Sequence, residues 1–175
     1  MYWLLVTYRL PGGSSSARVA VWREVRKSGA LQLQQSVVAF PDDVTFSRGV
    51  DRLRALVSEL GGETLAVRAE PLAAADGTRL LDAWNEARAA EYVELVDECG
   101  KFLAEIDHEF EIAKFTLAEL DEEESALDRL QGWHERIASR DLHAAPGSEN
   151  AHVALERARD ALDRYSTAVF ERTAP

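Results

Sequence analysis

Four basic side chains on one short segment could bind a negatively charged ligand. They are Arg18, Arg23, Arg26 and Lys27. Arginine and lysine donate hydrogen bonds to phosphate oxygens, so this segment is a candidate for nucleic-acid contact. Arg18, Trp22 and Arg26 are spaced i, i+4 and i+8, which places them on one side of a helix and permits cation–π stacking. The alternative is an ordinary solvated helix face that Glu24 partly neutralises.

A second pattern has the spacing of metal ligands. Glu105 and His108 form a Glu-x-x-His pair, the i, i+3 arrangement of di-metal sites in helical bundles. Such a site needs a second pair, and Glu149 with His152 supplies that spacing at the predicted start of the last helix. Solvated acidic helix faces produce the same spacing, so a metal site and an ordinary surface both remain open.

An arginine interrupts a predicted apolar stripe. Arg88 lies between Trp84 and Tyr92 at helical spacing, and Glu123 and Glu124 interrupt the stripe of a later helix. A buried charge is costly without a partner, so we expect an ion pair between these helices. The functional version is an oxyanion pocket lined by Arg88 and Tyr92. The candidate ligand-binding residues are these two together with Glu123 and Glu124. The structural version is an ion pair, or an arginine whose head reaches water at the end of a bundle.

Charge divides the 175-residue chain, whose net charge is -11, into two unlike halves. Residues 1–72 hold nine Lys/Arg and seven Asp/Glu, a balance of +2, whereas residues 73–175 hold eleven and twenty-four, a balance of -13. We therefore predict two subdomains, 1–72 and 73–175, with different surfaces. An acidic surface repels phosphates, so any nucleic-acid contact has to use the first half.

Composition favours a folded protein inside the cell. Apolar residues make up 46% of the chain, typical of a packed domain. No run approaches the ~18 consecutive apolar residues of a membrane span, and the N-terminal apolar segment lacks the basic leader and cleavage site of a signal peptide. We expect a cytoplasmic protein with no membrane partner. The single cysteine, Cys99, excludes an intrachain disulfide and a cysteine-rich metal site.

Periodicity predicts the elements that position these residues. Residues 2–10 form a strand, and a helix follows that Ser14, Ser15 or Ser16 caps. Two strands come next, with Leu33 and Ala39 on the buried side and Val38 on the other. A second helix, and a last strand at residues 63–69, complete the order βαββαβ, the ferredoxin-like split unit.

From residue 76 onward the pattern is helical only. An apolar stripe continues to Phe110, so the first of these helices spans about 30 residues unless Gly100 bends it. Thr116 and Glu119 form a capping box that starts the next helix. A third helix follows the linker around Pro146. The fold class is therefore α+β, a ferredoxin-like half followed by three antiparallel helices.

Several segments together resemble the N-terminal region of the ChrB family, chromate-responsive transcription regulators of bacterial chromate resistance. They are WLLVTYRLP (3–11), RVAVWREVRKSGALQLQQSV (18–37), GGE (61–63), KFTLAELDEEE (114–124) and the W…I…RDL…AP series (133–146). The resemblance implies a regulatory or interaction protein of the chromate or oxyanion stress response. It would contact DNA through its first half, or a separate protein partner. ChrB proteins usually continue into a C-terminal domain that this sequence lacks, so the resemblance does not carry over the effector chemistry of that domain.

The first half is also similar, more faintly, to the central domain of the phenylacetate repressor PaaX and to ferredoxin-like CRISPR nucleases. The PaaX resemblance implies a homodimer formed through the sheet. The nucleases carry a metal-binding Asp after a Tyr at the end of the first strand, but here Tyr8 is followed by Arg9, which cannot ligate a metal. The sequence therefore favours a regulator over an enzyme, and it leaves the identity of any cofactor unknown. The alternative is a metal-binding protein or enzyme with a polar site at the junction of the two halves.

Overall fold

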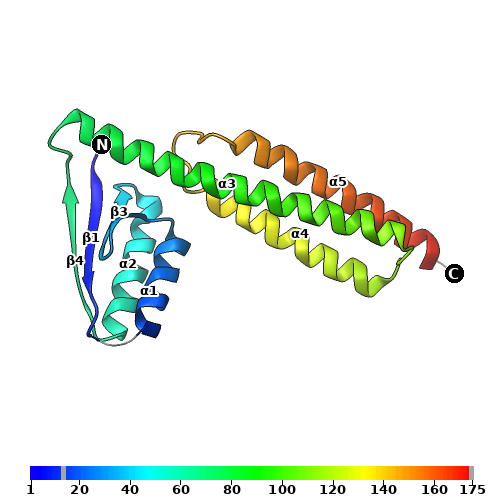
Figure 1. Cartoon of the computed structure of the whole chain (residues 1–175), viewed down its shortest axis with the longest axis horizontal. Helices are drawn as coiled ribbons and strands as arrows, with labels where there is room; N and C mark the ends of the chain where they lie inside the picture. The colour runs from blue at the N-terminus through cyan, green and yellow to red at the C-terminus, as the bar shows by residue number, and fades with distance from the viewer. Residues whose placement is uncertain (13–14, 174–175) are drawn as a thin grey trace. The chain divides into compact units, whose positions relative to one another are not determined.

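The chain is an α+β protein, as predicted, in a computed structural model that describes residues 1–12 and 15–173 (Figure 1). The elements are β1 (Trp3–Arg9), α1 (Ser15–Ser28), β2 (Leu31–Gln34), β3 (Val37–Pro41), α2 (Val44–Glu59), β4 (Glu63–Ala69), α3 (Ala74–Glu111), α4 (Leu117–Ala138) and α5 (Ser148–Thr173). The βαββαβ order and the three helices that follow it are thus confirmed. Ser14, one of the three predicted caps of α1, lies outside the described residues.

The four strands form one antiparallel sheet in the order β2-β3-β1-β4. Helices α1 and α2 lie together on one face of it (Figure 1). On that face the Phe40 ring lies 6.4 Å from the Phe46 ring of α2. A Cβ atom at Gly49 would come within 3.3 Å of Ser28 Cβ and 3.4 Å of Phe40, so glycine permits this close approach. Asp43 caps α2 by accepting from Thr45 N at 2.8 Å.

The predicted alternation along β2 and β3 is wrong in detail. Val38 is fully buried, whereas Leu33 is 40% exposed. Val38 pairs with Val6, also fully buried, in the middle of the sheet. The register of β2 against β3 shifts between Gln32 and Gln34, so Leu33 has no partner in the ladder. The shift accounts for Leu33, because side chains alternate with a period of two and one extra residue breaks that alternation. Val38 lies in β3, whose register with β1 is regular, and both Val38 and Ala39 are fully buried, so this strand is buried on both sides.

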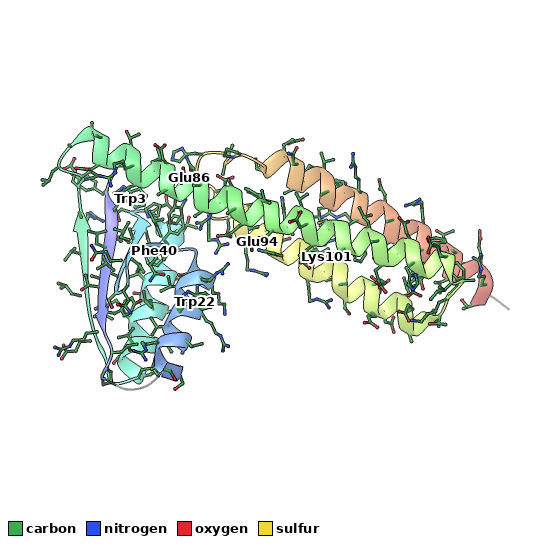
Figure 2. All side chains as sticks on the ribbon, in the orientation of Figure 1. Trp3, Trp22, Phe40, Glu86, Glu94 and Lys101 are labelled. Carbon is green, nitrogen blue, oxygen red and sulfur yellow. The ribbon has the colours of Figure 1, made fainter. Side chains whose placement is uncertain are left out.

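Packing divides the chain into two units, Met1–Trp84 and Asn85–Pro175. The sequence placed the boundary at residues 72/73, where the helical pattern begins. The first turns of α3 belong to the sheet unit because Trp84 packs edge-on against Trp3 and Phe46, with ring centroids 6.1 and 5.1 Å apart. Trp3 and Phe40 mark the core of this unit in Figure 2.

The second unit consists of residues 85–111 of α3 with α4 and α5. Its core includes Cys99, which is fully buried. Thr116 Oγ1 accepts from Glu119 N at 3.2 Å, which confirms the predicted start of α4. Helix α3 runs through Gly100 without a break and spans 38 residues, longer than predicted. Across residues 1–12 and 15–173, no helix combines the length and apolarity that crossing a membrane requires.

Candidate functional site

The basic segment of the sequence forms the outer face of α1. Helix α1 buries Ala17, Val21, Val25 and Ser28. The basic side chains Arg18, Arg23, Arg26 and Lys27 are all exposed. The Arg26 guanidinium carbon lies 5.4 Å from the centroid of the Trp22 ring, which confirms the predicted stacking. Glu24, the one acidic residue of α1, pairs with Arg52 Nε of α2 at 3.2 Å. The pairing offsets the Glu24 charge, so the outer face of α1 is basic.

A pocket of about 500 Å³ lies beside this face, within the first unit. The end of β1, one side of α1 and the β2–β3 hairpin form its walls; the lining residues are Tyr8, Arg9, Leu10, Arg18, Val19, Trp22, Gln32, Gln35 and Ser36. Two hydrogen bonds from Tyr8 fix the position of the β2–β3 hairpin. Its backbone N donates to Ser36 O at 3.0 Å, and its hydroxyl donates to Gln35 O at 2.9 Å.

The pocket is cationic and aromatic. Arg9 and Arg18 line it, and none of the described lining residues is acidic. Arg9 pairs with Glu63 at 3.1 Å, but both side chains are about four-fifths exposed, so water screens this pair. Burial raises the pKa of the Tyr8 phenol, which keeps it a neutral donor. The arrangement can bind an anion that carries an apolar or aromatic group.

The helical spacing predicted that Arg18 and Trp22 share one side of α1, but it did not predict the pocket that they line. The other walls come from residues 8–10 and 32–36, which only sheet pairing brings beside α1. The one available signal was the replacement of an acidic residue by Arg9 after Tyr8. That change argued against metal chemistry, and the structure shows that it also places a cation at the pocket.

The predicted partner of Arg88 is wrong. Arg88 Nη2 lies 2.8 Å from Glu91 Oε1, one turn along the same helix. The charges that act on Arg88 belong to Glu91, Asp141 and Tyr92, whereas those that act on Glu123 belong to other acidic residues. Burial lowers the pKa of Arg88, and Glu91 opposes that shift. Of the four predicted ligand-binding residues, the structure brings only Arg88 and Tyr92 together.

Arg88 and Tyr92 belong to a network around the end of α4. Arg140 donates to Glu91, which it shares with Arg88. The Tyr92 hydroxyl donates to Asp141 Oδ2 at 3.1 Å, and burial followed by the Asp141 charge raises the pKa of Tyr92 to about 12. Two arginines and two carboxylates make this network neutral in sum. Such a balance is typical of a structural ion-pair cluster.

Glu123 lies in an acidic region elsewhere in the second unit. It is 5% exposed, and burial raises the pKa of its carboxyl, as do the charges of Glu105, Glu119, Glu122 and Glu109. Lys114 partly balances this region, with Nζ 2.6 Å from Glu119 Oε2 and 3.8 Å from Glu109 Oε1. Glu105 and Glu123 also line a groove of about 420 Å³ together with Lys101 and Arg129. Glu124 is exposed.

The predicted metal pair is not joined by further ligands in the structure. His108 Nδ1 lies 3.9 Å from Glu111 Oε2, and both side chains are more than half exposed. Among the described residues, no group of three or more His, Cys, Asp or Glu side chains has an arrangement that could hold a metal ion. The assignment of Glu105 and His108 as ligands stays a prediction.

The fold and the site together define a class, a ferredoxin-like βαββαβ unit with a basic helix beside a cationic pocket, followed by a helical bundle. The family model described as "Protein ChrB, N-terminal" matches residues 18–175. The chain belongs to this family, as its sequence motifs predicted. The match begins at Arg18 and so includes most of α1. No curated protein matches the chain.

Proposed function

We propose that this chain is a ChrB-type regulatory protein of the chromate or oxyanion stress response, and that it acts by contacting nucleic acid. The observation that carries the proposal is the outer face of α1. Four basic side chains are exposed there, and Glu24, the one acidic residue of this helix, is paired with Arg52 of α2. Membership of the ChrB family supports the regulatory setting. The alternative of a metal-binding protein or enzyme stays a prediction, and the metal site it would use is not assembled among the described residues.

The electrostatics of the whole chain limit the strength of this contact. The net charge is -11, and most of the acidic residues lie in the second unit. Non-specific DNA affinities of about 10⁻⁴–10⁻⁶ M come from contacts between basic side chains and phosphates. We therefore expect the chain alone to bind duplex DNA at the weak end of that range, and to act with another DNA-binding component in the cell.

Fluorescence anisotropy with a random duplex at low salt tests the contact. Four cations predict that the logarithm of affinity falls with the logarithm of salt concentration with a slope of about -0.9 × 4, or about -3.6. The double variant Arg23→Gln/Lys27→Gln should reduce this slope by about two. Arg157→Gln/Arg164→Gln removes the same charge from exposed positions of α5 and should leave the slope unchanged.

One result would contradict the expected weakness of the contact and another the contact itself. Tight retention of duplex by low-micromolar protein in a gel shift would show that net charge does not limit binding, and it would strengthen the case for contact through α1. Equal slopes for the parent and the Arg23/Lys27 variant would show that α1 is not the contact surface. In the second case the regulatory role would need another surface of the protein.

We also propose that two copies associate through the sheet face opposite α1 and α2. The register places Leu5 opposite Val67, and Thr7 opposite Leu65, on that face. Leu65 is 62% exposed and Val67 43% exposed. These rows carry no charge, so a two-fold contact lets two acidic chains meet without bringing like charges together. The PaaX-like resemblance of the first half supports the same assembly.

A further inference from the structure

We propose that the pocket beside α1 binds a nucleotide, with its base against Trp22 and its phosphate between Arg9 and Arg18. This goes beyond the proposed function, because it assigns a small-ligand site to the wall of the sheet unit rather than a backbone contact to the outer face of α1. The pocket volume of about 500 Å³ lies within the range of roughly 300–1,000 Å³ typical of small-ligand sites.

Trp22 is the residue that points to an aromatic ligand. It is 48% exposed, whereas Trp3 and Trp84 are buried and Trp133 is half-buried. Trp22 is labelled on α1 in Figure 2. Arg26 stacks over its ring from the next turn of α1, which holds the indole where it lines the pocket. Every nucleobase has a flat π-face that can stack on an indole, and removing such a stack weakens binding by about 5- to 150-fold.

The hairpin supplies groups that suit the edge of a base. Gln32 and Gln35 line the pocket, and a side-chain amide both donates and accepts hydrogen bonds. Base edges present the same mixture of donors and acceptors. Gln32 Nε2 lies 3.5 Å from Gln35 O, at the limit of a hydrogen bond, so this donor can change partner at little cost.

Two arginines supply the site for the phosphate. Arg9 comes from the end of β1 and Arg18 from the first turns of α1, and both line the same pocket. Guanidinium groups bind phosphate oxygens in a bidentate geometry. The exposed pair between Arg9 and Glu63 is weak in water, so a phosphate can replace that carboxylate. A bare oxyanion would use these arginines but would leave Trp22 without a role.

Tryptophan fluorescence and calorimetry on the full chain test the proposal with AMP, GMP, CMP and UMP, with adenosine, and with inorganic phosphate. We expect at least one mononucleotide to bind and to quench the emission of Trp22. Adenosine and phosphate should each bind at least about tenfold more weakly than the best mononucleotide, because each lacks one half of the ligand. Trp22→Leu and Arg18→Gln should each weaken binding by about tenfold or more.

Matched controls separate the pocket from general effects. Arg54→Gln removes one exposed charge from α2, and Phe170→Leu removes one exposed ring from α5; both should bind like the parent. Circular dichroism should show that all four variants keep the helical content of the parent. Binding unchanged in Trp22→Leu would overturn the proposal. The proposal would also be overturned if inorganic phosphate bound as tightly as every mononucleotide. A third refuting result would be that no mononucleotide binds at concentrations up to about 5 mM, which corresponds to a binding free energy weaker than about -3 kcal/mol.

The source of the nucleotide is resolved by competition. The competitor is a short single-stranded oligodeoxyadenylate. If it displaces the mononucleotide at a concentration at least about tenfold below that of the mononucleotide, the ligand is the end or loop of a nucleic-acid strand. Weaker displacement identifies a free nucleotide. The duplex test of the proposed function changes Arg23 and Lys27, which do not line the pocket, so either proposal can fail while the other holds.

Discussion

The carboxylate of Glu91 binds two arginines, Arg88, which is buried, and Arg140, which is partly buried, and removing this carboxylate should destabilise the protein more than removing either arginine. Arg88 is 2% exposed and lies 2.8 Å from Glu91, which also accepts from Arg140. Glu91→Gln leaves two arginines beside each other with Asp141 as the remaining carboxylate of the network, and breaking a buried ion pair in this way costs about 3–5 kcal/mol. Arg88→Met keeps the apolar stem and leaves Glu91 with Arg140, so it should cost about 1.5–3 kcal/mol, the value of a bond to a charged group.

The double variant Arg88→Met/Glu91→Gln decides whether this account is right. It removes one cation and one anion, so it should be more stable than Glu91→Gln alone. The two single costs should exceed the cost of the double variant by about 1–3 kcal/mol, the coupling expected of residues in one network. Arg79→Met is the control on the same helix. Arg79 is 83% exposed and lies 3.7 Å from Asp76, so its loss should change stability by less than about 0.5 kcal/mol.

Urea unfolding followed by circular dichroism measures these free energies, and calorimetry shows whether the two units unfold in one transition or two. If the two single costs summed to the cost of the double variant within about 0.5 kcal/mol, that result would refute the account in which Arg88 and Arg140 depend on the shared carboxylate of Glu91. A second refutation would come from anions. If phosphate, sulfate or chromate raised the melting temperature of the parent but not of Arg88→Met, Arg88 would be a ligand-binding residue rather than a structural one.

Three further predictions follow from the same packing. Val67→Lys and Leu65→Lys place a charge on the proposed dimer face, so light scattering should give the monomer mass for these variants and twice that mass for the parent; a monomeric parent would refute the dimer. The raised pKa of Glu123 means that the folded protein binds this proton more tightly than the unfolded chain, so stability should fall as pH rises above the ordinary pKa of 4.5. Glu123→Gln should therefore raise the melting temperature at neutral pH and change it little below pH 4.5; a lower melting temperature at neutral pH would contradict this. Tyr92→Phe removes the hydrogen bond to Asp141 and should cost about 1 kcal/mol in urea unfolding, and no measurable loss would show that water replaces it.

The order of elements was predictable because each element carries its own signals. Apolar residues alternate or recur every three to four positions, and Thr116 and Asp43 mark helix starts that the structure confirms. The error at Val38 has a different origin. Strand β3 lies between β2 and β1, and its neighbouring residues Val38 and Ala39 are both fully buried, so the strand has no solvent side for the alternation to mark.

The pocket was less predictable than the elements around it. The helical spacing of Arg18 and Trp22 placed both on one side of α1, but it did not show what faces them. That depends on the β2–β3 hairpin returning beside the end of β1, which the bonds from Tyr8 to Gln35 and Ser36 record. Side chains that form one site from three elements share no sequence spacing, so only the folded chain brings them together.

The residue that faces Arg88 from the end of α4, by contrast, could have been predicted by counting along the chain. Antiparallel helices joined by a tight turn bring together residues at equal distances from the centre of that turn. The turn between α3 and α4 centres on Lys114. Glu105 and Glu123 each lie nine residues from that centre, so they should face each other. Arg88 and Arg140 each lie twenty-six residues from it and should face each other as well. In the structure, the charge of Glu105 raises the pKa of Glu123, and the charge of Arg88 lowers the pKa of Arg140. Arg88 and Glu105 are 17 residues apart on one helix, about 26 Å at 1.5 Å per residue, so a pair between Arg88 and Glu123 was excluded by distance. The apolar stripe gave the correct face of each helix, and the turn determines which residues along that face meet.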